Sequence, residues 1–187
     1  MDPDRPGGHT GFIMQMPTAP GSSGALSRYT PLFTLAAWYV ALAFVLRVVL
    51  WATFGRTAQV GAGALAWMLP AGLFADAIQS LYLLAPFALF LWLMRDRWHR
   101  RGAMRGVLLG GAFLWMFAML FVAACEYFFF EEFDSRFNLV AVDYLMYPTE
   151  VAGDIWAEYP VVPLVIAAAL LAAACTWLLR RPLTAGT

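Results

Sequence analysis

Four long stretches of nearly uncharged residues constrain the fold of this chain more than any other feature of its sequence. They cover residues 32–54, 70–94, 107–125 and 161–179. An α-helix rises about 1.5 Å per residue, so each stretch would be about 28 Å long or longer as a helix, against a hydrocarbon core of about 30 Å. The backbone of a crossing segment must satisfy its own hydrogen bonds, as a helix does. The sequence therefore predicts an all-α integral membrane protein with about four transmembrane helices.

Composition agrees with a membrane protein. Hydrophobic residues make up 62% of the chain and charged residues 13%, whereas a soluble domain has about 25% charged residues. The formal net charge is zero, which gives no basic surface for nucleic acid, so we expect membrane lipids and no nucleic acid as partners. Residues 1–28, rich in Gly, Pro, Ser and Thr, are predicted to be a disordered tail. The membrane domain then covers residues 29–181, and residues 182–187 form a short second tail.

The charges between the spans predict an orientation. Five arginines lie between residues 95 and 105, whereas the segment 126–160 holds eight acidic residues and only Arg136 as a basic one. Loops that face the cytoplasm carry an excess of Lys and Arg. We therefore expect the 95–105 loop and both termini to be cytoplasmic, and the segment 126–160 to be external.

Two charged residues lie inside predicted spans. Arg47 lies about 10 Å below the outer end of the first span, and Asp76 lies about 9 Å below the outer end of the second. Charges at such depths usually pair or face water, and these two are on consecutive antiparallel helices. We expect them to pair. The pair either fixes the helices to each other or lines a polar path for a lipid headgroup or a proton, and an outward-snorkelling Arg47 is a further alternative.

The chain shows no catalytic motif or metal-binding motif. Cys125 and Cys175 would lie at different depths, too far apart for a disulfide. His9 and His99 have no second ligand at metal-binding spacing. Phosphate loops, nucleophile elbows and zinc-protease motifs are also absent from the sequence. We expect no catalytic centre and no cofactor in this chain.

The external segment has aromatic residues at helical spacing. They predict an amphipathic helix in the headgroup zone, which the proline at 148 would end. Glu132 and Arg136 are spaced to pair on this helix, and Asp143 lies on the same face seven residues further on. The spaced apolar positions are Phe129, Phe133, Phe137, Val140, Tyr144 and Tyr147.

The same segment resembles a known family. It is similar to the outer loop of the sulfatase-like, lipoteichoic-acid-synthase-type enzymes, which belong to the alkaline phosphatase superfamily and include phosphoglycerol transferases. Weaker similarities are Arg47 in the first span and the Gly72-x-x-x-Asp76 pattern in the second. Pro148 and Asp154 depart from the family pattern. The positions that carry the resemblance most clearly are Glu132, Arg136, Asn138, Asp143, Tyr144, Glu150, Tyr159 and Pro160, together with Phe129, Phe133, Phe137, Ala141, Val142, Leu145, Tyr147, Val151, Gly153 and Ile155.

The resemblance implies a membrane-anchoring role in the bacterial cytoplasmic membrane. In that family about five spans precede an external catalytic domain with a Thr nucleophile and a divalent metal, typically manganese. None of those catalytic positions has a counterpart in residues 1–187. We therefore expect the chain to be the membrane portion of such a transferase or hydrolase of envelope lipids or glycans, from a truncated or split gene. Its partner would be a sulfatase-like catalytic domain encoded downstream.

Two other functions remain open from the sequence. The chain would serve as a stand-alone four-span structural or assembly protein if no catalytic domain accompanies it. Alternatively, it would be a small transporter or proton-conducting subunit that uses Arg47, Asp76 and Gln79 inside the membrane.

Overall fold

The computed structural model describes residues 23–55, 61–94, 102–136, 142, 146 and 148–185. Within these residues the chain is helical and contains no strand. The helices are α1 (Ser23–Phe54), α2 (Ala62–Leu93), α4 (Gly102–Phe133), α6 (Pro148–Glu158), α7 (Val161–Leu178) and α8 (Arg180–Leu183).

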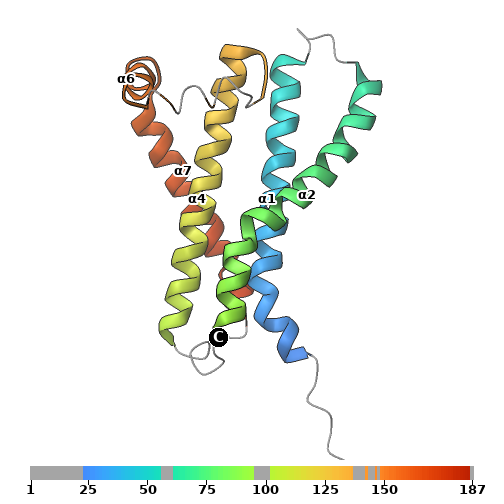
Figure 1. Ribbon diagram of the computed structural model, residues 1–187, viewed down its shortest axis with the longest axis vertical. Helices are drawn as coiled ribbons and strands as arrows, with labels where there is room; N and C mark the ends of the chain where they lie inside the picture. Colours follow the sequence, from blue (N-terminus) through green and yellow to red (C-terminus); the bar gives the residue numbers. More distant parts are fainter. Residues whose placement is uncertain are drawn as a thin grey trace, which may run out of the picture.

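The four long helices α1, α2, α4 and α7 run side by side as a bundle (Figure 1). Helix α1 packs against α2 on one side and α4 on the other, and α4 packs against α7. Helix α6 is seen end-on at the top of Figure 1, so it lies across the bundle axis. Helix α8 lies at the opposite end and packs against α1, α4 and α7. We refer to these two ends as the α6 end and the α8 end.

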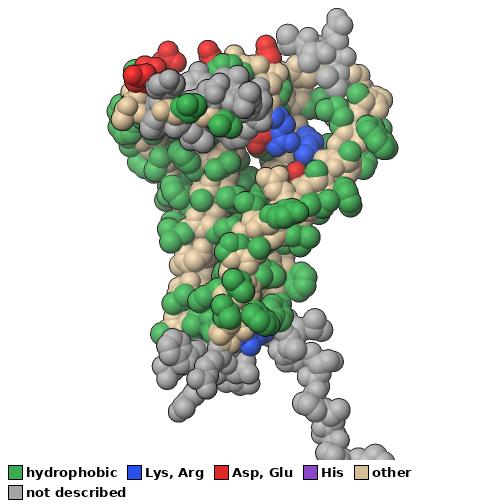
Figure 2. Space-filling view, viewed as in Figure 1, with side chains coloured by type: hydrophobic (Ala, Val, Ile, Leu, Met, Phe, Trp, Pro, Cys, Tyr) green, Lys and Arg blue, Asp and Glu red, His purple; other side chains and the backbone are tan. Residues whose placement is uncertain are grey.

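The structure confirms four helices that can cross a membrane. By length and composition they are Arg28–Phe54, Ala66–Leu93, Gly102–Phe133 and Val161–Leu178. Their outer surfaces are covered with apolar side chains (Figure 2). The chain is thus a multi-pass membrane protein.

Exposed tryptophans agree with this placement. Trp67, near the start of α2, is 78% exposed, and Trp92, near its end, is 68% exposed. Trp156 on α6 and Trp177 near the end of α7 are also exposed. Tryptophan favours the two membrane interfaces, where its ring meets both lipid and water. One pair of these residues lies toward the α6 end and the other toward the α8 end, as two interfaces require.

The protein core is small and lies in the half of the bundle toward the α8 end. Thr176 of α7 donates a hydrogen bond to the Sδ atom of Met116 on α4, at 3.6 Å, inside this core. A small core is sufficient here because lipid, rather than protein, covers the remaining apolar surface. The buried residues that form it are Leu35, Leu84, Ala112, Met116, Ala172 and Leu183.

Helix α2 is bent, and its first half leans away from α1 toward the α6 end (Figure 1). The helix contains Pro70 and Pro86. Proline lacks an N–H group, and its ring crowds the carbonyl group four residues earlier, which for Pro86 is that of Tyr82. The sequence placed the start of this span at Pro70, whereas the helix begins eight residues earlier at Ala62. Pro70 is therefore inside the helix, which membrane helices tolerate.

Both predicted tails are partly wrong. Helix α1 begins at Ser23, so residues 23–28 continue the helix beyond the apolar stretch. At the other terminus, Leu183 belongs to α8 and is only 1% exposed, because its side chain joins the core. Residues 1–22 lie outside the described part of the chain.

A further helix lying across one end of the bundle is present, as α6, but the bounds predicted for it, Phe129 to Tyr147, are wrong. Helix α4 ends at Phe133, and Asp134 adopts the left-handed backbone conformation with φ of 49°. The N–H of Asp134 donates to the carbonyl oxygen of Phe130 at 2.9 Å, which is a common way to end a helix. Pro148 begins α6 instead of ending a helix, because proline is well suited to the first helical turn.

Candidate functional site

Arg47 of α1 and Asp76 of α2 form an ion pair near the α6 end. Arg47 donates from Nη1 to one carboxylate oxygen at 2.9 Å and from Nη2 to the other at 3.2 Å. The side chains are only 15% and 5% exposed. This two-pronged geometry is the strong form of an arginine–carboxylate contact. The pairing expected from the helix depths is present in the structure.

Gly72 provides the space that Arg47 occupies. It lies one helical turn before Asp76, so both face the same neighbour. A Cβ atom at position 72 would lie 1.9 Å from Nη1 of Arg47 and 2.1 Å from Cζ. Any side chain larger than hydrogen would displace the guanidinium. The Gly72-x-x-x-Asp76 pattern thus accommodates Arg47. Gly72 leaves space for the guanidinium, and Asp76 forms the ion pair with it.

A second ion pair lies at the same end of the bundle. Arg136 donates from Nε to a carboxylate oxygen of Glu126, because the turn at Asp134 brings the chain back over α4. The predicted partner was Glu132, which would have required the helix to continue through residue 136. Glu132 is instead exposed on the last turn of α4.

The two ion pairs lie close enough to affect each other. The hydrogen bond that Arg136 donates to Glu126 raises the pKa of Arg136, burial opposes this effect, and the negative charges of Glu126 and Asp76 raise the pKa further. Tyr39 is within electrostatic range of all four charged groups. Figure 2 shows basic and acidic side chains gathered in a hollow of this face, below the α6 end. We call Arg47, Asp76, Glu126 and Arg136 the charged cluster.

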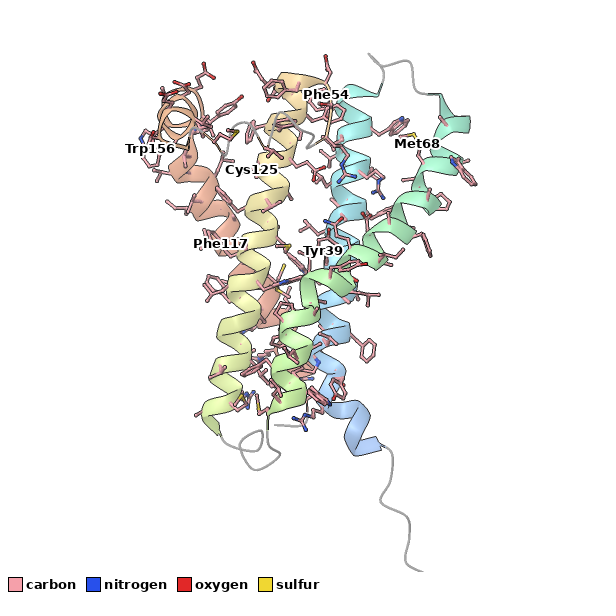
Figure 3. The ribbon with its side chains drawn as sticks, in the orientation of Figure 1. Tyr39, Phe54, Met68, Phe117, Cys125 and Trp156 are labelled. Carbon is pink, nitrogen blue, oxygen red and sulfur yellow. The ribbon has the colours of Figure 1, made fainter. Side chains whose placement is uncertain are left out.

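Aromatic contacts join α1 to α4, the helices that carry Arg47 and Glu126. The ring of Tyr39 lies 6.1 Å from that of Trp115 on α4, and both residues belong to the α1–α4 contact. Phe54, at the end of α1, packs 5.1 Å from Phe130 and 5.8 Å from Tyr127. These contacts hold the end of α1 against the part of α4 that carries Glu126. Figure 3 shows Tyr39 about midway along the bundle and Phe54 near its α6 end.

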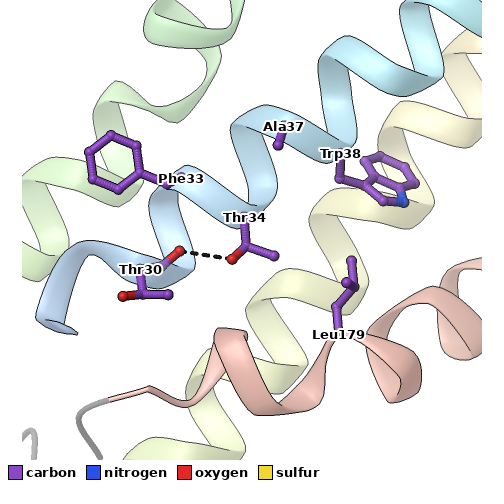
Figure 4. Close-up of a pocket in the computed structure, with 6 residues that line it drawn as sticks. All are labelled: Thr30, Phe33, Thr34, Ala37, Trp38 and Leu179. Carbon is purple, nitrogen blue, oxygen red and sulfur yellow. Dashed lines mark hydrogen bonds between the residues drawn. The ribbon is translucent and has the colours of Figure 1, made fainter. Parts of the chain in front are cut away.

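Two grooves run along α1. The first, of about 790 Å³, lies between α1 and α2 and is lined mainly by apolar side chains, including Val40, Phe44 and Leu73. The second, of about 520 Å³, is shown in Figure 4 and lies toward the α8 end, between α1 and the residue that follows α7. Inside it, Thr34 donates a hydrogen bond to the carbonyl oxygen of Thr30 at 2.9 Å. Its lining residues are Thr30, Phe33, Thr34, Ala37, Trp38 and Leu179.

The structure unites only some of the residues predicted as a site. Arg47, Asp76 and Arg136 belong to the charged cluster. Glu150 is exposed on α6. Tyr159 packs its ring 4.8 Å from that of Phe128, and Pro160 precedes the first turn of α7. Asn138, Asp143 and Tyr144 lie outside the described residues.

Sequence reasoning did not select Glu126 or Tyr39. Glu126 follows the predicted end of the third span directly, and a carboxylate at that depth was a usable signal. Tyr39 carries a hydroxyl group inside an apolar stretch, and such a tyrosine becomes a candidate only when a polar group is known to lie beside it. Both signals depend on knowing which helices are adjacent.

The described residues contain no group of three or more His, Cys, Asp or Glu side chains placed to hold a metal ion. Cys125 and Cys175 are free thiols on α4 and α7.

Comparison of the chain with protein-family models, with curated proteins and with solved structures gives no match. The fold, the membrane spans and the charged cluster are therefore the basis on which a function is inferred.

Proposed function

We propose that this chain is the membrane-anchoring domain of a sulfatase-like enzyme that acts on envelope lipids or glycans through a phosphoglycerol- or phosphoethanolamine-type transfer or hydrolysis. The catalytic domain, with its divalent metal, would be a separate polypeptide or a further domain. In this arrangement the α6 end faces outward and presents lipid headgroups to that domain.

One observation carries the proposal. Arg47, Gly72 and Asp76, which are the positions of the weaker family similarity in the first two spans, meet at a single point in the structure. Gly72 leaves room for the guanidinium of Arg47 beside the carboxylate of Asp76. Arg136, from the strongest part of the resemblance, lies within electrostatic range of the same point. Residues from three separated segments thus converge at one end of the bundle.

The distribution of charge supports the orientation. Acidic side chains are exposed at the end of α4 and just after it, at Glu131, Glu132 and Asp134. Helix α6 carries further exposed acidic residues. Figure 2 shows these acidic groups along the top of the molecule. The α8 end carries the exposed Arg180 and Arg181. Positive charge favours the cytoplasmic side, so the α8 end and the C-terminus would be cytoplasmic.

Co-purification tests the proposal. The DNA beside the coding region is read for a sulfatase-like domain, and that polypeptide is expressed together with the tagged chain. We expect it to be retained with the chain from detergent-solubilised membranes. A chain in which Trp156, exposed on α6, is changed to Ala should retain less of that polypeptide. Equal retention on an unrelated four-span protein would contradict the proposal.

A further inference from the structure

The charged cluster is electrically balanced. Among the described residues it combines two arginines with two carboxylates, Arg47 with Asp76 and Arg136 with Glu126. Adding an anion would leave one uncompensated negative charge beside the largely buried side chains of Arg47, Asp76 and Glu126, and adding a cation would leave a positive one. Uncompensated charges at such depth are costly. A ligand with one charge of each sign leaves the balance unchanged.

The arginines keep hydrogen-bonding capacity for a phosphate. A guanidinium has five N–H donors, and Asp76 accepts from Nη1 and Nη2 of Arg47, with one contact at each atom. Gly72 leaves the space that this guanidinium occupies. The planar fork of arginine suits phosphate oxygens. Arg136 is the accessible member, because its side chain is 48% exposed whereas that of Glu126 is 12% exposed.

The apolar groove between α1 and α2 is lined by residues that neighbour Arg47 and Asp76 along their helices. Leu73 and Ala77, on either side of Asp76 in sequence, line it together with Phe44, which lies one turn before Arg47. Ser80, one turn beyond Asp76, lines it as well. The bend in α2 separates the two helices toward the α6 end (Figure 1). An amphipathic molecule with a charged head and an apolar tail therefore matches the combined surface.

We propose that the charged cluster binds the headgroup of one zwitterionic phospholipid, with the phosphate on Arg47 and Arg136, the ammonium group on Glu126, and one acyl chain in the groove between α1 and α2. The inference rests on and deepens the proposed function, because it names the lipid that the α6 end presents. Binding requires Arg136 to turn from Glu126 toward the phosphate, which frees Glu126 for the ammonium group. The Arg47–Asp76 pair stays intact.

Native mass spectrometry of the purified chain in detergent tests this inference. Phosphatidylethanolamine and phosphatidylglycerol with identical acyl chains are titrated in competition, and bound lipid is counted. We expect the wild-type chain to retain one phosphatidylethanolamine with a preference of about tenfold, the effect of one charge-assisted hydrogen bond. A wild-type preference for phosphatidylglycerol would overturn the inference, whatever the variants do.

Single substitutions then test which side chains bind the phosphate and which binds the ammonium group. Glu126→Gln gives the cluster a net positive charge and should turn the preference toward phosphatidylglycerol. Arg136→Gln should weaken the binding of both lipids by about tenfold. Glu132→Gln, the matched control, makes the same charge change on an exposed residue near the end of the same helix and should leave the preference unchanged. An equal shift in Glu132→Gln and Glu126→Gln would show a general surface-charge effect and contradict the site.

The tail and the dependence on the proposed function are tested separately. Soluble glycerophosphoethanolamine, which lacks acyl chains, should displace the lipid poorly. Displacement at the same concentration as the intact lipid would refute the role of the groove. Lipid binding is measured on the chain alone, so a negative result does not affect the co-purification experiment. A failed co-purification likewise does not affect the measured lipid preference.

Discussion

Gly72 of α2 lies directly beneath the guanidinium of Arg47 on α1, so close that a Cβ atom at position 72 would be 1.9 Å from Nη1. The contact places a backbone against a charged side chain at the level of the ion pair with Asp76. The long side chain of Arg47 thus reaches from α1 to the backbone of α2. Residues on both helices therefore determine where Arg47 points.

The first prediction concerns this close approach. Gly72→Ala should lower the stability of the protein in detergent by about 1–3 kcal/mol, because overpacking must displace Arg47 or separate the helices. Gly63→Ala is the control, since nothing lies within 4 Å of its Cβ position on the same helix. Alanine at Gly63 should be neutral or stabilising by up to about 1 kcal/mol. Thermal unfolding followed by circular dichroism gives the comparison, and equal effects of the two changes would refute the packing role of Gly72.

The second prediction concerns the Arg47–Asp76 pair. Arg47→Leu and Asp76→Leu should each reduce the folded yield, because removing one partner leaves a buried charge without compensation, a loss of about 3–5 kcal/mol in buried pairs. The double substitution should recover part of the yield. Size-exclusion chromatography of the detergent-solubilised variants measures the monodisperse fraction.

Additive losses in the double variant would show that the two residues act independently. The reversed pair, Arg47→Asp with Asp76→Arg, separates structure from function. Because the lipid phosphate is placed on Arg47, the reversed variant should fold and lose the lipid preference. A reversed variant that keeps the preference would show that the pair only fixes the helices.

The long apolar stretches were sufficient to predict most of the fold. Hydropathy and length identify all four spans because a lipid environment requires helices of that length. The same reasoning placed Arg47 and Asp76 at matching depth. Sequence reasoning did not find the start of α2. Residues 62–69 are helical, but the first turn has no capping side chain and no charged residue that would mark it.

The errors lie where contacts between distant segments decide the structure. The aromatic spacing after Phe129 continues a helical pattern, but the backbone turns at Asp134, and the side chain of Arg136 meets Glu126 instead of Glu132. Leu183 looked like part of a tail because its burial depends on α1 and α4. Local spacing carries no information about such contacts, so these features appear only in three dimensions.

The third prediction separates the observed partner of Arg136 from the expected one. A double-mutant cycle between Glu126→Gln and Arg136→Gln should give a coupling free energy of about 0.5–1 kcal/mol, small because Arg136 is half exposed. The parallel cycle between Glu132→Gln and Arg136→Gln should give a coupling near zero. Chemical unfolding in detergent measures both, and the reverse order of the couplings would favour a continuous helix through residue 136.

The fourth prediction concerns orientation. In a chain whose native cysteines are changed to Ala, Asp154→Cys on α6 should react with a membrane-impermeant maleimide on intact cells. Arg181→Cys on α8 should react only after the membrane is permeabilised. Both positions are exposed in the structure, so burial does not explain a lack of labelling. Labelling of Arg181→Cys alone on intact cells would reverse the proposed topology.

Transfer activity in membranes tests the proposed function most directly. Membranes that contain the chain, the sulfatase-like polypeptide that the proposal requires, or both are assayed for metal-dependent cleavage of a lipid phosphodiester. We predict turnover when both are present and little with the catalytic polypeptide alone, because the anchoring domain brings the catalytic site to its lipid substrate. Metal-dependent turnover by the purified chain, or equal turnover by the catalytic polypeptide without it, would contradict the anchoring role.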